Sequence, residues 1–295
     1  MLKIDKIIFG DNQFFGINHM SEDKAQQLAE KFHDLKSIID VYDIAINNGI
    51  NSIMLNSNDR AKEICDYFRD NKTKYTNINW YPSIPYPHKY ANLVAEKGIM
   101  PTINEVIFSD NSTRGLFGLI TKGSSALFGQ DAVKIMQMLI DIEIKVFRDL
   151  NIKVIFLQNI ITDLLLGLKA KVFFTEYTKY IKTKYKVVPG FITMNLPNLI
   201  NSLREWGVEE VAICSSINKI GYLMSPDNKS YEETLKNIDR GKYQIMAMSV
   251  LASGAIKAED AFQYIGNQKI DSIVFGASSE KNIQESVNLI RKFCQ

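Results

Sequence analysis

The sequence predicts an α/β protein with a single (β/α)8 barrel, and three observations lead to this fold class. The chain has 295 residues, of which 46% are hydrophobic and 23% charged, a composition and length that suit one large globular domain. Short apolar runs alternate with helical patterns, as is typical of parallel βα units. There are about eight such runs, the number that closes a TIM barrel of roughly 250 residues. We therefore expect residues 1–295 to form one barrel domain.

The strands are predicted where short runs of β-branched and aromatic residues stop at polar or small residues. Each run is too short for a core helix. In chain order the expected strands are Lys6–Phe9, Ser52–Leu55, Asn79–Ser83, Val154–Leu157, Val187–Ile192, Glu210–Cys214, Gln244–Met248 and Ser272–Phe275.

The helices are predicted from amphipathic spacing and from residues that cap helix ends. Ser21 precedes two acidic residues and opens a first helical region, because acids are favourable at the positive end of the helix dipole. Gly49 ends the second helix as a C-cap. The further helices are expected at Leu35–Asn48, Asp59–Asp70, His88–Glu96, Ala132–Leu150, Val172–Lys184, Asn198–Trp206, Tyr231–Ile238, Ala258–Gly266 and Glu280–Phe293.

One segment, Asp110–Gln130, breaks the alternation of strands and helices. It is rich in Gly and Ser, contains two Leu-Phe-Gly steps, and follows the third strand. We interpret it as an insertion over the barrel mouth. It is either a lid with glycine hinges or an ordered insertion that packs on the helical ring.

Charge and cysteine content exclude several classes of function. The formal net charge is +2, so no global field favours nucleic acid or a membrane surface. The three cysteines have neither disulfide-framework nor metal-site spacing, and no metal site is expected. We expect a cytoplasmic protein acting on a small molecule, and homo-oligomer formation stays open.

Catalytic groups of such barrels follow the carboxyl ends of the strands. After the first strand, Asp11 and His19 could exchange protons as an acid/base pair. The amides of Asn12, Gln13 and Asn18 could bind a polar ligand. The alternative is a loop whose Asn and Asp side chains cap its own turns.

The other strand ends add polar side chains and one lysine. Asn56 could face the pocket or cap the next helix. Lys219 could bind a phosphate or form a Schiff base, or it could face solvent. The remaining substrate-binding candidates are Tyr81, Gln158, Asn159, Asn195 and Asn218.

The last two loops are expected to bind phosphate. Loops 7 and 8 are the usual phosphate site of this fold, and small residues let an anion approach backbone N–H groups. The candidates are Ser249, Ser253, Gly254, Gly276, Ala277, Ser278 and Ser279.

The chain resembles the aldo-keto reductases, best in Val187–Leu199 and Gln244–Arg291 and more loosely in Ala45–Leu55. The family's last loop reads roughly Gly-Ala, six residues, Glu-Glu-Asn. Here Gly276, Ala277, Ser278 and Glu285 match that pattern, and Ser286 replaces the Asn. The resemblance implies a barrel fold and NADPH as the cofactor, with its adenosine phosphate held by this loop.

The catalytic tetrad of the family is not recognisable by this alignment. Its aspartate falls at Met54 and its tyrosine at Asp59, while its histidine falls at Gln158 and no lysine ends the third strand. On this basis we favour a non-redox enzyme, a lyase or isomerase for a phosphorylated, sugar-like or nucleotide-bearing substrate. The alternatives are a divergent NAD(P)H-dependent oxidoreductase, with His19 or Tyr81 as the acid, and a catalytically silent barrel that serves as a binding subunit.

Overall fold

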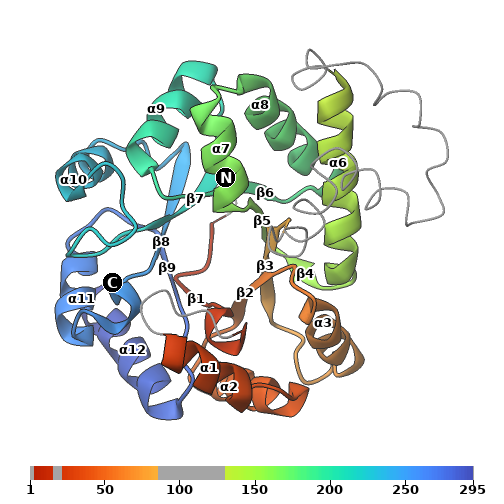
Figure 1. Ribbon diagram of the computed structural model, residues 1–295, viewed down its shortest axis with the longest axis vertical. Coiled ribbons are helices and arrows are strands. Elements are labelled where there is room, and N and C mark those ends of the chain that lie inside the picture. The colour runs from red at the N-terminus through yellow and green to blue at the C-terminus, as the bar shows by residue number, and fades with distance from the viewer. Residues whose placement is uncertain (1–2, 16–21, 86–129, 295) are drawn as a thin grey trace.

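A computed structural model describes residues 3–15, 22–85 and 130–294, and within these residues eight parallel strands close a barrel (Figure 1). The barrel strands are β1 (Ile7–Phe9), β2 (Ser52–Asn56), β3 (Asn79–Ile84), β5 (Val154–Leu157), β6 (Val188–Thr193), β7 (Val211–Ser216), β8 (Tyr243–Met248) and β9 (Ser272–Phe275). A ninth strand, β4 (Asn151–Ile152), pairs with the start of β3 just before β5 begins.

Closure of the barrel follows from the pairing of β1. This strand pairs with β2 on one side and β9 on the other, where Ile8 lies opposite Val274. The remaining order is β9-β8-β7-β6-β5-β3, and β3 returns to β2. The predicted fold class is therefore confirmed, with all eight predicted strands in place to within two residues at either end.

Helices surround the strands (Figure 1). Side-chain caps fix four helix starts, because Asp34, Asn195, Asp227 and Ser279 each accept a hydrogen bond from a backbone N–H three residues on. The described α-helices are α1 (Glu22–Lys31), α2 (Leu35–Asn47), α3 (Ala61–Asp70), α6 (Gln130–Ile144), α7 (Asn159–Gly167), α8 (Lys171–Tyr180), α9 (Leu196–Trp206), α10 (Asn228–Lys236), α11 (Ala258–Gly266) and α12 (Glu280–Phe293). Shorter turns are η1 (Asn12–Phe15), η3 (Lys145–Phe147), η4 (Ile181–Tyr185) and η5 (Ala252–Gly254).

The structure differs from the sequence prediction in four helices. Helix α8 stops at Tyr180, and the π-helical turn η4 replaces the predicted end at Lys184. Helix α7 was not expected, because its apolar sequence lacks a clear polar face. Helix α6 stops at Ile144, and the 3-10 turn η3 replaces its predicted last turn. Helix α10 begins earlier than predicted, directly after its cap Asp227. The predicted helix His88–Glu96 and the lid segment up to residue 129 lie outside the described residues.

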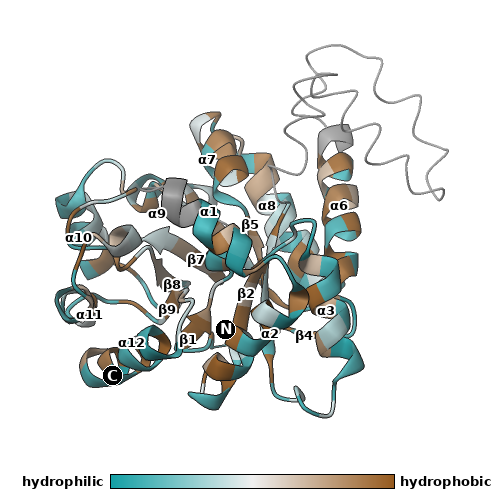
Figure 2. Ribbon diagram, turned by 60° about the horizontal axis from the view of Figure 1, so that its bottom comes forward, coloured by the Kyte–Doolittle hydropathy of each residue, from teal (hydrophilic) through white to brown (hydrophobic). Residues whose placement is uncertain are grey.

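Two apolar clusters separate the barrel interior from the layer under the helices. The interior cluster takes alternate strand residues: Ile8, Met54, Tyr81, Val154, Phe156, Val188, Ile192, Ala212, Cys214, Met246 and Val274, together with Ile4. The larger cluster joins the outward residues of the strands to the helices. Figure 2 shows the hydrophobic strands at the centre, with helices of mixed hydropathy around them. The interior is thus filled by side chains, and ligands have access only at the ends of the barrel.

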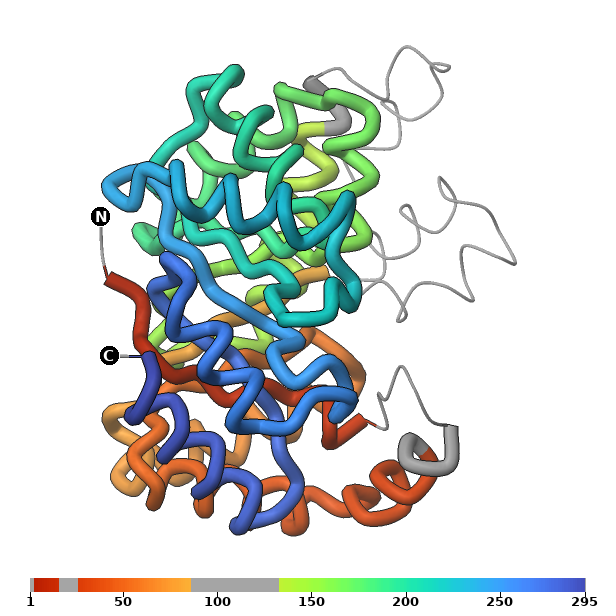
Figure 3. Tube along the Cα trace, turned by 90° about the vertical axis from the view of Figure 1, so that its left-hand side faces the viewer, coloured from red at the N-terminus to blue at the C-terminus, as the bar shows by residue number. Residues whose placement is uncertain are grey.

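The side view in Figure 3 places the start of β1 and the end of α12 at the same end of the barrel. This is the amino end, where each helix returns to the next strand. The loops that follow the strands therefore gather at the opposite, carboxyl end, where enzymes of this fold have their active sites.

Candidate functional site

The inward residues at the carboxyl end form the layer that faces the barrel mouth. In β2, β3 and β7 they are Asn56, Ser83 and Ser216, two residues beyond the interior residues Met54, Tyr81 and Cys214. The same spacing brings in one side chain each from the ends of β5, β6 and β8. We call the six residues the mouth layer: Asn56, Ser83, Gln158, Met194, Ser216 and Met248.

Asp11, directly after β1, is bonded to this layer. The backbone N–H of Asn56 donates to Asp11 Oδ2 at 2.8 Å, and Asn56 Nδ2 donates to Oδ1 at 2.8 Å and Oδ2 at 3.0 Å. Gln158 Nε2 in turn donates to Asn56 Oδ1. The loop after β1 and the ends of β2 and β5 are thereby held together by one chain of polar groups.

Burial raises the pKa of Asp11 to about 6, although the hydrogen bonds from Asn56 oppose this shift. The side chain is only 3% exposed. Burial raises the pKa of the Tyr42 hydroxyl on α2 well above its usual value, and the negative charge of Asp11 adds to this shift. Asp11 can therefore change protonation near neutral pH, while Tyr42 stays neutral.

Besides the Tyr42 hydroxyl, two buried polar atoms of the mouth and of the loop after β1 have no hydrogen-bond partner among the described residues. They are the hydroxyl of Ser83, which lies on β3 between Asn56 and the end of β5, and Gln13 Oε1 in η1. The Gln13 amide is fixed because its Nε2 donates to the Gly10 carbonyl at 2.8 Å. Unpartnered buried acceptors and donors are costly, so both atoms are suited to a bound ligand or water.

The other half of the mouth layer is built around Met194. Ser216 Oγ lies 3.5 Å from Met194 Sδ and donates to Ser249 Oγ at 3.1 Å. The Met194 backbone is held by Asp163, which accepts its N–H at 3.0 Å, and by Tyr231, which donates to its carbonyl at 2.8 Å. This half offers thioethers and hydroxyls in place of amides. The mouth layer therefore has a polar half with Asn56, Ser83 and Gln158, and a more apolar half with Met194, Ser216 and Met248.

The loops after β8 and β9 border the loop after β1, because β9 lies between β8 and β1. Ser249, Ala252, Ser253 and Gly254 all have positive φ, and the Ala252 and Gly254 N–H groups donate within the turn to the Ser249 and Leu251 carbonyls. A Cβ on Gly276 would lie 2.0 Å from Gln13 Oε1, so an alanine there would have to displace the Gln13 amide. Lys31 Nζ donates to the Ser278 carbonyl at 2.6 Å and adds a positive charge. The first N–H groups of α12 follow at Ser279.

The structure brings several predicted site residues together. Asp11, Asn56 and Gln158 form one cluster, and Gln13 lies beside Gly276. Ser249 Oγ accepts a hydrogen bond from Ser216 of the mouth layer, and Ser253 Oγ lies 3.3 Å from the Tyr222 hydroxyl. Asn12 is exposed in η1, while Asn159 begins α7.

The placement of Tyr81 near the pocket is wrong. Its hydroxyl donates to Asp5 Oδ2 and accepts the Asp5 backbone N–H, ahead of β1 at the amino end of the barrel. Sequence position alone does not tell toward which end an inward side chain leans. The suggestion of Tyr81 as an acid falls with this placement.

Other predicted residues have structural tasks or remain untested. Asn195 caps α9, and both polar groups of the Asn218 amide bond the Tyr222 backbone. Lys219 is exposed, which gives no support to the Schiff-base option because that chemistry needs desolvation. Glu285 is exposed on α12. Asn18 and His19 lie outside the described residues, so their roles stay predictions.

Sequence reasoning missed Lys31, Ser83 and all three residues of the second half of the mouth layer. Lys31 lies 247 positions from Ser278, and no local pattern connects them. Met194, Ser216 and Met248 were not selected because Met and Ser carry no catalytic pattern. Their positions at strand ends were the available signal.

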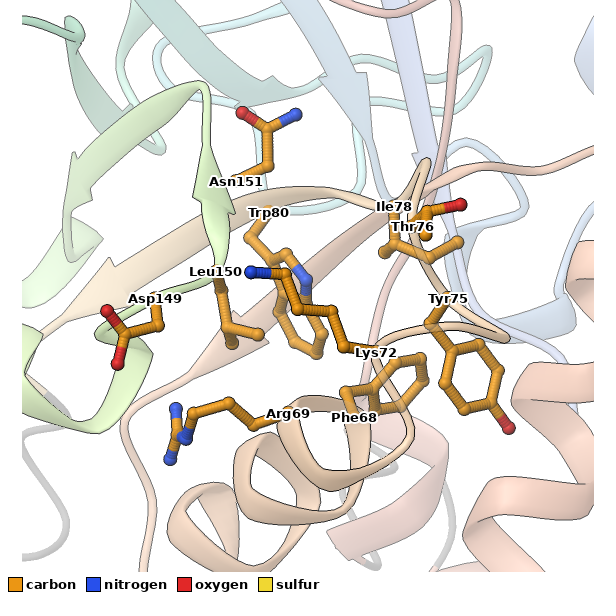
Figure 4. A pocket seen from close by; sticks show the side chains of 10 residues that line it. All are labelled: Phe68, Arg69, Lys72, Tyr75, Thr76, Ile78, Trp80, Asp149, Leu150 and Asn151. Atoms are coloured by element: carbon orange, nitrogen blue, oxygen red, sulfur yellow. The ribbon is translucent and has the colours of Figure 1, made fainter.

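A cavity of about 330 Å³ opens at the amino end, away from these groups (Figure 4). Its walls include Phe68, Tyr75 and Trp80 beside the starts of β3 and β4. Arg69 on its rim is already bonded to the carbonyls of Val146 and Arg148. Residues at the amino end of such barrels serve the stability of the fold. We therefore place the functional site at the carboxyl end.

The described part of the chain contains no group of three or more His, Cys, Asp or Glu side chains arranged to hold a metal ion. Within the same residues, no helix is long and apolar enough to cross a membrane.

No protein-family model matches the chain, and no curated protein matches its sequence. Solved structures do match its fold. A Pseudomonas aeruginosa protein classed as an aldo-keto reductase is 11% identical with a TM-score of 0.62, over 99% of this chain and 92% of that one. Aldose reductase from Schistosoma japonicum is 9% identical with a TM-score of 0.56, over 97% and 83% of the chains. An aldo-keto reductase from Bacillus halodurans is 9% identical with a TM-score of 0.53, over 97% and 86%.

These comparisons show that the chain has the barrel of the aldo-keto reductases, as the sequence resemblance implied. They also correct the preferred function. The favoured lyase or isomerase is wrong on this comparison, because these neighbours are reductases, and the alternative of an NAD(P)H-dependent oxidoreductase fits better.

Proposed function

We propose that the protein is an NAD(P)H-dependent oxidoreductase that interconverts a small carbonyl compound and its alcohol. The observation that carries this proposal is the order of the strands. The loop after β9, which leads into the N-terminus of α12, lies directly beside the loop after β1, which holds the titratable carboxyl of Asp11. A reductase needs both features next to each other, one for the cofactor and one for proton exchange.

The residues at the mouth fit a dinucleotide cofactor. The start of α12 offers backbone N–H groups to phosphate oxygens. Lys31 supplies a positive charge at the same loop. The missing Cβ of Gly276 leaves room against Gln13, whose unpartnered Oε1 could accept a hydrogen bond from a ligand. When bound, the cofactor would supply or accept the hydride.

The chain's own residues would then hold the substrate and manage the proton. Ser83 and Gln158 offer hydrogen bonds to a polar substrate in one half of the mouth layer, and Met194 and Met248 offer an apolar surface in the other. Reduction of a carbonyl requires a proton on its oxygen, and oxidation of the alcohol returns it. Asp11, whose pKa lies near 6, is the titratable group that the described structure provides for this coupling, and His19 remains its predicted partner.

The test is a titration of the purified protein with NADPH and NADH, followed by thermal unfolding. Binding at a hundredfold excess over Kd should add about 2.7 kcal/mol of stability. Ser278→Glu should abolish the effect by repelling phosphate, while Ser278→Ala should keep it because the backbone donors remain. A folded protein that gains no stability from either cofactor at millimolar concentration would refute the proposal. Turnover with a panel of aldehydes and ketones would then identify the substrate.

A further inference from the structure

Asp11, Asn56 and Gln158 form a directed chain of hydrogen bonds. An ionised carboxyl group can only accept hydrogen bonds. Both N–H groups of Asn56, on the backbone and the side chain, accordingly point to Asp11. The amide oxygen of Asn56 is then turned away and accepts from Gln158 Nε2. The side-chain oxygen of Gln158 takes no part in these hydrogen bonds.

A proton on Asp11 makes this arrangement inconsistent. The protonated carboxyl must donate one hydrogen bond, yet it faces two donors of Asn56. The backbone N–H can still donate to Oδ2, so the side-chain amide is the part that has to change. A half-turn of the Asn56 amide brings its oxygen to the new O–H and its Nδ2 to Gln158. Gln158 then has to present its own oxygen to Asn56, which requires the same half-turn.

We propose that Asp11 is a positioning residue whose proton reverses the Asn56 and Gln158 amides together. With Asp11 ionised, Gln158 offers the mouth an oxygen, which binds a hydroxyl, ammonium or amide N–H of a ligand. With Asp11 protonated, Gln158 offers an N–H, which binds a carbonyl or other acceptor. The inference goes beyond the proposed function and does not depend on it, because it requires no cofactor.

The described titratable groups around Asp11 do not change charge near pH 6. Helix α2 contributes Tyr42, and burial raises its pKa so that it stays neutral. Cys65 of α3, which interacts with Tyr42, also stays neutral because burial raises its pKa. The strands β2 and β3 contribute Asn56 and Ser83, which have no titratable group. Within the described residues no ion pair involves Asp11.

Nuclear magnetic resonance of the labelled, ligand-free protein tests the proposal directly. The carboxyl carbon of Asp11 and the side-chain amide signals of Asn56 and Gln158 would be followed from pH 4.5 to 8. We expect all three to shift with one common midpoint near pH 6. The matched control is the amide of Asn218, which is 1% exposed and bonds only backbone groups, so its signal should stay constant. If Asp11 titrates while Gln158 does not move, the proposal is wrong, and it is equally wrong if Asp11 does not titrate in this range.

Two variants separate the chain from a general effect of charge. In Asp11→Asn the new amide can donate permanently, so the Gln158 signal should keep its low-pH position throughout. In Asn56→Leu the chain is cut, so Asp11 should still titrate while the Gln158 shift is lost. A Gln158 shift that persists in Asn56→Leu would show that it senses Asp11 through space, which contradicts the proposal. Loss of NAD(P)H binding would refute the proposed function but leave these signals unchanged.

Discussion

At the scale of single residues, the buried carboxyl of Asp11 links stability to pH. Its pKa is about 6 in the folded protein and 3.8 in an exposed chain, so the folded state binds the proton more tightly. The stability that the proton contributes is full below pH 3.8 and is lost as pH rises through 6. The loss is of order one to three kcal/mol, because one pKa unit corresponds to about 1.4 kcal/mol.

Asp11→Asn removes this dependence. We therefore expect the stability of the variant, relative to the wild type, to improve by about one to three kcal/mol between pH 4.5 and pH 7.5. Urea unfolding at the two pH values measures this difference. Asp40→Asn, which removes an exposed carboxyl paired with Lys36 on α2, is the control and should not gain stability relative to the wild type over this range. A relative stability of Asp11→Asn that is the same at both pH values would mean that burial does not shift this carboxyl.

Gly276 depends on its contact with Gln13 in the same loop cluster. Because an added Cβ would meet Gln13 Oε1 at 2.0 Å, Gly276→Ala has to displace a side chain whose Nε2 is held by the Gly10 carbonyl. We expect a loss of about 1–2 kcal/mol, typical of overpacking. In the Gln13→Ala background the same substitution should cost clearly less. A double-mutant cycle in urea measures this coupling, and purely additive effects would contradict it.

At the scale of elements, the glycine on β6 decides how the barrel interior is filled. Gly190 faces the interior, and an added Cβ would lie 2.4 Å from Phe156 Cδ1 and 2.8 Å from Val154 Cγ1 on the neighbouring strand. Phe156 is fully buried and cannot move aside. We expect Gly190→Ala to destabilise the protein by about 2 kcal/mol or more.

Gly167→Ala is the matched control for this prediction. Gly167 ends α7, and an added Cβ there would meet nothing within 4 Å. Alanine is favoured over glycine in helices by up to about 1 kcal/mol, so this variant should be neutral or slightly more stable. Thermal unfolding of both variants measures the contrast. Equal effects would mean that Phe156 does not depend on the space at Gly190.

The same elements show how far the sequence predicts the structure. Strands such as Ser52–Asn56 were predictable because an apolar run that stops at polar residues is a local pattern. Asp11, Asn56 and Gln158 could be selected since they follow strand ends. Their bonds to one another could not be predicted, because they depend on the stagger of β1, β2 and β5. Helix α7 was missed since its outward Leu164 is apolar and 58% exposed, which hides the usual amphipathic pattern.

At the scale of the whole molecule, the barrel separates two ends with different tasks. The packed interior between them excludes a ligand that would pass from one end to the other. The carboxyl end has Lys31 beside the loop after β9, whereas the amino end has Lys72 on the rim of the cavity in Figure 4. Both lysines are exposed. They therefore allow the same charge reversal to be made at either end of one protein.

If the proposed cofactor site is correct, Lys31→Glu should weaken NADPH binding by roughly tenfold, since it replaces an attraction of about 1 kcal/mol by a repulsion. Lys72→Glu makes the same change of net charge at the opposite end of the barrel. It should leave the affinity unchanged at physiological salt, because salt screens the interaction of exposed charges that lie more than about 8 Å apart. Titration of cofactor fluorescence with each variant measures both affinities. The effect of Lys31→Glu should shrink as salt is added. An equal loss in both variants would indicate a general effect of net charge, and no loss in either would move the phosphate away from the loop after β9.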